Sequence, residues 1–199
     1  NGADYWMRGA LSAVGLGHSL LLPVMLMFVL FAWHVLARDP WRVKPATIGG
    51  MMAESLVFAC CLVAIGQIHN AVFSALPDVK ELSVTAAPPS ARVIAFIGAG
   101  VYEEVLFRLC LVPAAYGLFR LVEVPHRWAA IGSILVTSVV FAVAHYVGPA
   151  ADSFTLFSFS FRTIAGVFFA ALFVVRGFGI TVGAHAAYDL LVGVLFASN

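Results

Sequence analysis

Charged residues are scarce in this chain. Asp, Glu, Lys and Arg make up 11% of the 199 residues, against roughly 25% in a typical soluble domain. Hydrophobic residues make up 62%, and a soluble core of this size could not bury so much apolar surface. We therefore expect a polytopic integral membrane protein. The formal net charge is only +1 and the sequence has no basic cluster, so nucleic acid is not an expected partner.

Cysteine is also rare, with three residues, Cys60, Cys61 and Cys110, all inside apolar runs. They have neither the spacing of metal ligands nor the pattern of a secreted disulfide framework. We expect them to be small packing residues.

Long apolar runs dominate what remains. Six of them are long enough to suggest membrane-spanning helices, at residues 13–36, 50–73, 91–116, 128–146, 158–175 and 179–197. The one substantial loop between them is 76–90, and no repeat or composition shift divides the chain. The sequence predicts an all-α fold: one transmembrane domain, residues 1–199, forming a polytopic membrane helix bundle of about six helices.

Two adjacent acids, Glu103 and Glu104, interrupt the third apolar run. A charged side chain at the centre of a membrane helix costs at least about 2.5–3.5 kcal/mol, so such residues are paired or functional. Glu104 and Arg108 are four residues apart, which favours an ion pair on one helix face. Glu103 points about 100° away around the helix and has no such partner. It is therefore the better candidate for a general base.

Two other runs carry polar residues at the same helical spacing. Phe141 and His145 share a face of the fourth run, and His185 and Asp189 share a face of the sixth. Each set alone fits a structural role, such as a buried ion pair or a hydrogen bond between helices. Because these sets hold most of the few ionisable residues within the spans, we expect the third, fourth and sixth spans to form one polar intramembrane chamber.

The ordered set Glu-Glu-x-x-x-Arg, Phe-x-x-x-His and His-x-x-x-Asn/Asp on separate membrane helices resembles the CPBP family of intramembrane glutamate proteases. That family includes the CAAX prenyl endopeptidases, bacteriocin-processing and self-immunity proteins, and relatives paired with C-terminal sorting signals. It therefore implies either CAAX-like processing or removal of a C-terminal sorting signal or anchor. The resemblance covers a catalytic motif core of about residues 91–197, and the first two spans match nothing specific. The matching residues are Glu103, Glu104, Arg108, Phe141, His145, His185 and Asp189.

The resemblance implies a metal-independent endopeptidase with no cofactor. Glu103, assisted by His145, would deprotonate a water molecule, and His185 with Asp189 would support the oxyanion. Glu104 and Arg108 would fix the helix and tune Glu103, and Phe141 would support the site. The implied substrate is a membrane-anchored or lipidated protein or peptide. Membrane lipids are the other expected partners, and the expected location is the cytoplasmic (inner) membrane of a prokaryote.

Position 189 departs from several members of the family, which have Asn there. An ionised Asp189 cannot donate a hydrogen bond to an oxyanion. We therefore expect it to accept a hydrogen bond from His185 and so orient the ring.

Three other functions fit the same residues. The first is a non-proteolytic membrane scaffold or bacteriocin self-immunity protein. The second is a transporter that uses Glu103 and His145 as a proton relay. The third is a metal-dependent membrane protease, because the five acids and histidines are a plausible zinc-ligand set. No His-Glu-x-x-His motif supports the zinc alternative.

The remaining polar residues in or near the spans carry weaker expectations. His18, Glu54, Gln67 and His69 are more typical of interfacial or helix-pairing residues than of chamber lining. Arg162 opens the fifth span, where its side chain is expected to extend to the membrane surface or, alternatively, to bind a substrate carboxylate.

The distribution of Lys and Arg predicts the orientation of the chain. The links after spans one, three and five hold six such residues and the opposite side holds four, which favours an amino terminus outside. The six are Arg38, Arg42, Lys44, Arg120, Arg127 and Arg176; the four are Arg8, Lys80, Arg92 and Arg162. Because His145 lies just before the helix-ending Gly148-Pro149, this orientation places the site near the extracytoplasmic face.

Overall fold

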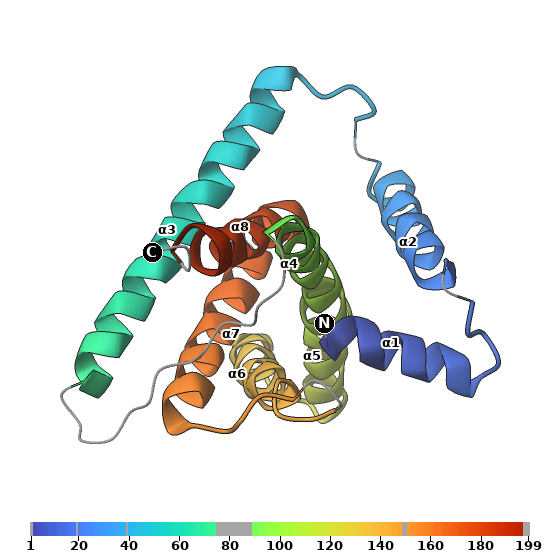
Figure 1. Ribbon diagram of the computed structural model, residues 1–199. Coiled ribbons are helices and arrows are strands. Elements are labelled where there is room, and N and C mark those ends of the chain that lie inside the picture. The colour runs from blue at the N-terminus through green and yellow to red at the C-terminus, as the bar shows by residue number, and fades with distance from the viewer. Residues whose placement is uncertain (1, 19, 39, 75–88, 149–150, 197–199) are drawn as a thin grey trace.

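The computed structural model describes residues 2–18, 20–38, 40–74, 89–148 and 151–196. Within these ranges the chain is helical and contains no strand, so the predicted all-α membrane bundle is confirmed (Figure 1). The predicted loop at 76–90 lies mostly outside the described residues. The elements are α1 (Gly2–Ala13), α2 (Leu21–Ala37), α3 (Pro45–Ser74), α4 (Pro89–Glu104), η1 (Val105–Leu111), α5 (Val112–Leu121), α6 (His126–Ala144), α7 (Leu156–Arg176), α8 (Phe178–Leu190) and η2 (Leu191–Phe196).

Each of the six predicted spans corresponds to a helical segment. Among the described helices, α3, α6 and α7 are long and apolar enough to cross a membrane. Two other apolar segments, in α2 and in α8 with η2, are shorter than a full span. The remaining predicted span, 91–116, carries four charged residues and is formed by α4, η1 and α5 in succession.

The amino-terminal region differs from the prediction. A single span at 13–36 was expected, but α1 ends at Ala13 and the next helix begins only at Leu21. Between them, Gly15 has a positive φ of 81°, a conformation that glycine adopts without strain. Ala3 of α1 is buried against Phe107 and Phe141, so this short helix packs over the motif core.

The third predicted span contains a π-helical segment, η1, directly after the two acids. Pro113 lies at the start of α5 and has no N–H to continue the α-helical hydrogen-bond ladder. A wider π turn before it relieves the clash of the proline ring with the preceding turn. Such segments are frequent at functional sites, and this one carries Arg108.

The core of the bundle lies where α3, α7 and α8 meet. Leu62, Phe169 and Ile180 are buried together there. Glycines allow α8 to approach its neighbours, because a Cβ on Gly183 would lie 2.4 Å from the Ser55 hydroxyl oxygen of α3 and one on Gly100 of α4 would lie 3.0 Å from the Ala186 nitrogen. Close approach at small residues is typical of helix packing in membranes. A one-residue link at Gly177, with φ 83°, turns the chain from α7 into α8.

The outer surface of the described helices is strongly apolar, as a surface in contact with lipid would be. The three cysteines lie on this exposed surface. The expectation that they pack in the interior is therefore wrong: apolar surroundings in the sequence do not distinguish a lipid-facing position from a core position.

Candidate active site

A cavity of about 750 Å³ lies within the bundle and contains the predicted polar residues. Three spans were expected to form it, but its lining comes from α3, α4, α6, α7, α8 and η2. Most of the lining side chains are apolar. The polar ones are Gln67, Glu103, His145, Ser158, Arg162, His185, Tyr188 and Asp189.

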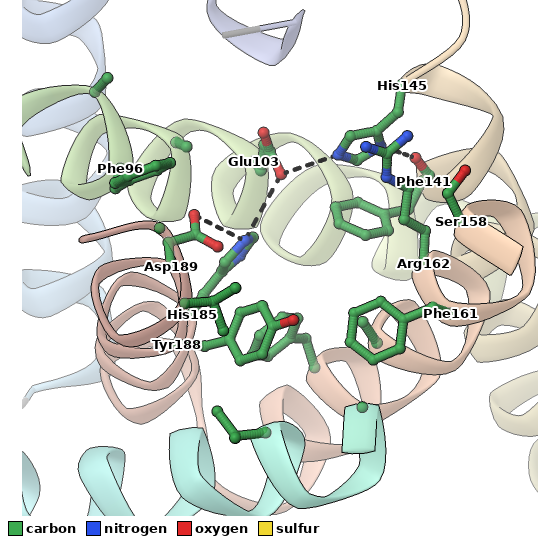
Figure 2. A pocket seen from close by; sticks show the side chains of 18 of the residues that line it. Phe96, Glu103, Phe141, His145, Ser158, Phe161, Arg162, His185, Tyr188 and Asp189 are labelled. Atoms are coloured by element: carbon green, nitrogen blue, oxygen red, sulfur yellow. Dashed lines mark hydrogen bonds and ion pairs between the residues drawn. The ribbon is translucent and has the colours of Figure 1, made fainter. Parts of the chain in front are cut away.

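Glu103 projects into this cavity from the end of α4, between two histidines that come from other helices (Figure 2). Its Oε2 atom lies 3.9 Å from Nε2 of His145 and 3.8 Å from Nε2 of His185. Both separations are too long for a direct hydrogen bond. The Glu103 side chain is 12% exposed, so the carboxylate is enclosed but reachable from the cavity.

Glu104 points away from the cavity and is fully buried. Its Oε2 lies 3.1 Å from Nε of Arg108, so the predicted same-face ion pair is confirmed. Its Oε1 accepts a 2.7 Å hydrogen bond from Nδ1 of His185 on α8. The two neighbouring acids therefore differ in their contacts: Glu104 joins two elements of the bundle, whereas Glu103 faces the cavity.

Arg108 is almost completely buried, which requires that its charge be compensated. Besides Glu104, its Nη2 donates to the Gly166 carbonyl of α7 at 3.3 Å. Its guanidinium carbon lies 4.4 Å from the centre of the Phe141 ring and 5.5 Å from that of Phe169, within the range of cation–π interactions. Arg108 thus ties η1 to α6 and α7 around the site.

His145 lies one residue beyond the end of α6. Its Nδ1 donates to the Phe141 carbonyl at 2.8 Å, one of the carbonyls that a helix end leaves without a backbone partner. The Phe141 ring meets the His145 ring edge to face at 4.8 Å. Because Nδ1 carries the proton, Nε2 of the neutral ring is an acceptor, and Nε2 is the atom that faces Glu103.

The expected hydrogen bond between His185 and Asp189 is absent from the described site. Nε2 of His185 lies 3.7 Å from Oδ2 of Asp189, which is an ion-pair distance and not a hydrogen bond. The carboxylate that orients His185 is Glu104, through Nδ1. The expectation failed because helical spacing places Asp189 near His185 but cannot reveal a partner on another helix.

Two residues of the site carried no sequence signal that singled them out. Phe169 stacks on His185, with ring centroids 4.4 Å apart and an interplanar angle of 16°. Gly166 presents its carbonyl to Arg108, and a Cβ there would lie 2.9 Å from that of Ser138 on α6. Both lie in the fifth predicted span, among other phenylalanines and small residues that look the same in sequence.

The weaker candidates separate into cavity and pairing residues. Gln67 lines the cavity. His69 on α3 hydrogen-bonds to Ser160 on α7 at 2.8 Å, and Glu54 forms an ion pair with Arg176. Both therefore pair helices, as expected. His18 accepts a 3.3 Å hydrogen bond from the backbone N–H of Leu20, outside the cavity lining.

The zinc alternative receives no geometric support from the described part of the chain. Within it, no three His, Cys, Asp or Glu side chains are grouped as metal ligands would be. The two glutamates of the possible zinc-ligand set point in different directions. Glu103 faces the cavity, whereas Glu104 faces away from it.

Comparison with known protein families gives a match to the part of the chain that carries the motifs. The family model for type II CAAX prenyl endopeptidases, Rce1-like, matches residues 85–191. This range contains all seven predicted motif residues, and it agrees with the resemblance read from the motifs. No curated protein and no solved structure matches the chain.

Proposed function

The chain belongs to the Rce1-like family of type II CAAX prenyl endopeptidases, and from this premise we propose that it is a glutamate-type intramembrane endopeptidase. Its substrate would be a membrane-anchored, lipidated protein cleaved near its carboxyl terminus. Glu103 and His145 activate the attacking water. His185 stabilises the oxyanion, and Asp189, at ion-pair distance from His185, supports the positive charge of its ring. We place the enzyme in the cytoplasmic membrane of a prokaryote.

The observation that carries this proposal is the position of Glu103 opposite His145. Oε2 of Glu103 and Nε2 of His145 are both acceptors, and they lie 3.9 Å apart in a cavity. A water molecule about 2.8 Å from each atom fits this separation and can donate one hydrogen to each. Both acceptors then increase the nucleophilicity of the water oxygen, which is the function of a general base.

Cleavage follows from this arrangement. The water oxygen attacks the carbonyl carbon of the scissile peptide bond, and Glu103 takes the proton that the water loses. His185, protonated on both nitrogens, donates from Nε2 to the oxyanion while its Nδ1 remains bonded to Glu104. When the carbon–nitrogen bond breaks, Glu103 returns the proton to the leaving amine.

The rest of the cavity suits a lipidated substrate. Away from the polar residues it is lined by aromatic and aliphatic side chains from α3, α4, α7 and η2, including Phe96, Phe157, Phe161 and Val192. An apolar chain that moves from the bilayer into such a lining stays in apolar surroundings, so its transfer costs little. A membrane-anchored substrate would therefore enter from the lipid with its lipid chain along these residues.

Cleavage by purified protein tests the proposal. A lipidated peptide ending in a CAAX motif is incubated with wild type and with Glu103→Gln, and the products are identified by mass spectrometry. We expect the wild type to release one carboxyl-terminal fragment and the variant to release none above background. Cleavage by Glu103→Gln at the wild-type rate would refute the assignment of the general base. Absence of cleavage by wild type, with the biological phenotype intact in Glu103→Gln, would favour the scaffold alternative.

The orientation of the site provides a second test. A prenylated CAAX substrate is presented in the cytoplasm, so the His145 end of the cavity must open there. This requirement is opposite to the orientation that the Lys and Arg counts predict, a difference of only six against four. Fusions of green fluorescent protein and alkaline phosphatase after Ala150 should give fluorescence without phosphatase activity. Phosphatase activity at that position would instead favour exported substrates with C-terminal sorting signals.

A further inference from the structure

The cavity that holds Glu103 and His145 is also lined by an arginine, Arg162 of α7. Thr155 caps α7 by accepting a 3.1 Å hydrogen bond from the Ser158 backbone N–H, so Arg162 lies about two turns into the helix. Its side chain is only 16% exposed. In the view of Figure 2 it lies on the opposite side of Glu103 from Asp189. Arg162 was expected to extend to the membrane surface, but in the structure it lines the cavity.

The Arg162 guanidinium is held in place by two neighbours. Nη2 donates to Oδ2 of Asp152 at 2.5 Å, and the guanidinium carbon lies 5.1 Å from the centre of the Tyr146 ring. The Tyr146 hydroxyl is in turn hydrogen-bonded to that of Ser158 at 2.6 Å. A fixed, planar guanidinium loses little conformational entropy when it binds an acceptor.

One nitrogen of this guanidinium has unused hydrogen-bonding capacity. Nη1 of Arg162 is buried, and no acceptor among the described residues bonds to it. A buried donor without a partner is costly, and here the donor belongs to a side chain in the lining of the cavity. The ion-pair partner, Asp152, is bonded through Nη2, so the hydrogens of Nη1 are not used by it.

We propose that Arg162 is a positioning residue that binds the free C-terminal carboxylate of the substrate through Nη1. This inference rests on the proposed endopeptidase function. A CAAX motif ends its chain, so a carboxylate lies a few residues beyond the scissile bond. Arginine is well suited to bind it. Glu103 and Asp189 repel a carboxylate from their part of the cavity. The charges therefore orient the peptide, with the segment to be released between Glu103 and Arg162.

The test compares two peptides that differ only at the carboxyl terminus, one a free acid and one an amide. Both carry the same lipid and sequence, and kcat/KM is measured for wild type, Arg162→Gln and Arg162→Lys. We expect wild type to prefer the acid by roughly tenfold or more, as a hydrogen bond between charged groups would give. Arg162→Gln should lower cleavage of the acid far more than cleavage of the amide, so that the preference for the acid is lost. Arg162→Lys should keep part of the preference.

Arg120→Gln is the matched control, because Arg120 bonds the Val124 carbonyl outside the cavity lining; it should retain the full preference for the acid. Equal cleavage of acid and amide by wild type would overturn the inference. So would an equal loss on both peptides in Arg162→Gln, since that result would show a merely structural role. A preference for the acid that persists in Arg162→Gln would assign carboxylate recognition to another residue.

A binding experiment separates this inference from the proposed function. Glu103→Gln, which should not turn over, is used as the background, and the affinities of acid and amide peptides are measured with and without Arg162→Gln. A preference for the acid that depends on Arg162 supports carboxylate binding even if wild type cleaves neither peptide. Equal affinities with Arg162 present would overturn carboxylate binding even if wild type cleaves both.

Discussion

The same substitution, Glu to Gln, should have different effects at the adjacent positions Glu103 and Glu104. At Glu104 we expect a large loss of stability, and at Glu103 we expect a loss of activity with little loss of stability. Glu104 is fully buried and accepts from His185 while pairing with Arg108. In Glu104→Gln, the single amide oxygen cannot accept from both His185 and Arg108. The NH₂ group of the glutamine then faces one of these two donors. The charge of Arg108 is then left buried without compensation, which typically costs about 3–5 kcal/mol. For a chain of this length that corresponds to a fall in Tm of about 10 °C.

Glu103→Gln should behave differently. Glu103 lies 3.8 and 3.9 Å from its nearest histidine nitrogens, so the substitution breaks no direct hydrogen bond of the described site. We expect a change in Tm of less than about 3 °C, which corresponds to about 1 kcal/mol. Activity should nevertheless fall by about 10²–10⁴-fold, as for loss of a general base.

The assay is thermal unfolding in detergent, followed by the fluorescence of the four tryptophans, together with cleavage of the lipidated peptide. A further variant, Glu104→Gln with Arg108→Met, removes the uncompensated charge and should recover part of the lost stability. It should remain impaired in activity, because His185 has still lost its orienting carboxylate. Equal falls in Tm for Glu103→Gln and Glu104→Gln would refute the reasoning, as would a stable and active Glu104→Gln.

Three further predictions follow from the same site. Asp189→Asn should retain activity within about tenfold, because its amide can itself donate to the oxyanion. Asp189→Ala removes the group at ion-pair distance from His185 and puts no donor in its place, so it should lose about 10²-fold in kcat. Near-complete loss in both would show that the negative charge itself is needed. Gly166→Ala should lower the free energy of unfolding by about 1–3 kcal/mol, because its Cβ would meet Ser138 at 2.9 Å. Gly98→Ala, whose Cβ would meet nothing within 4 Å, should not. Activity should survive exhaustive dialysis against a chelator, and a loss that zinc restores would instead establish a metal-dependent protease.

Local patterns in the sequence predicted the contacts within single helices. The four-residue spacing of Glu104 and Arg108 gave an ion pair at 3.1 Å, and that of Phe141 and His145 gave an edge-to-face ring contact at 4.8 Å. These predictions succeeded because the helical period fixes which side chains share a face. The same rule placed Asp189 near His185 but suggested a hydrogen bond that the structure does not contain.

Contacts between helices were beyond the reach of such patterns. The hydrogen bond from His185 to Glu104 joins residues far apart in the chain. It depends on how closely α4 and α8 pack, which is set in part by Gly100 against Ala186. No spacing rule relates positions on different helices. The break between α1 and α2 was likewise missed, because an apolar run shows where a helix can form and not where turns interrupt it.

By itself, the sequence determined that this is a helical membrane protein and which charged residues needed an explanation, because the cost of burying charge in an apolar run depends on composition alone. Only the tertiary structure decided the environment of each acid. It buried Glu104 between Arg108 and His185 and left Glu103 facing the cavity between two imidazole nitrogens. Neighbours in sequence acquired different environments because they point in different directions from α4, and the helices they meet are set by packing.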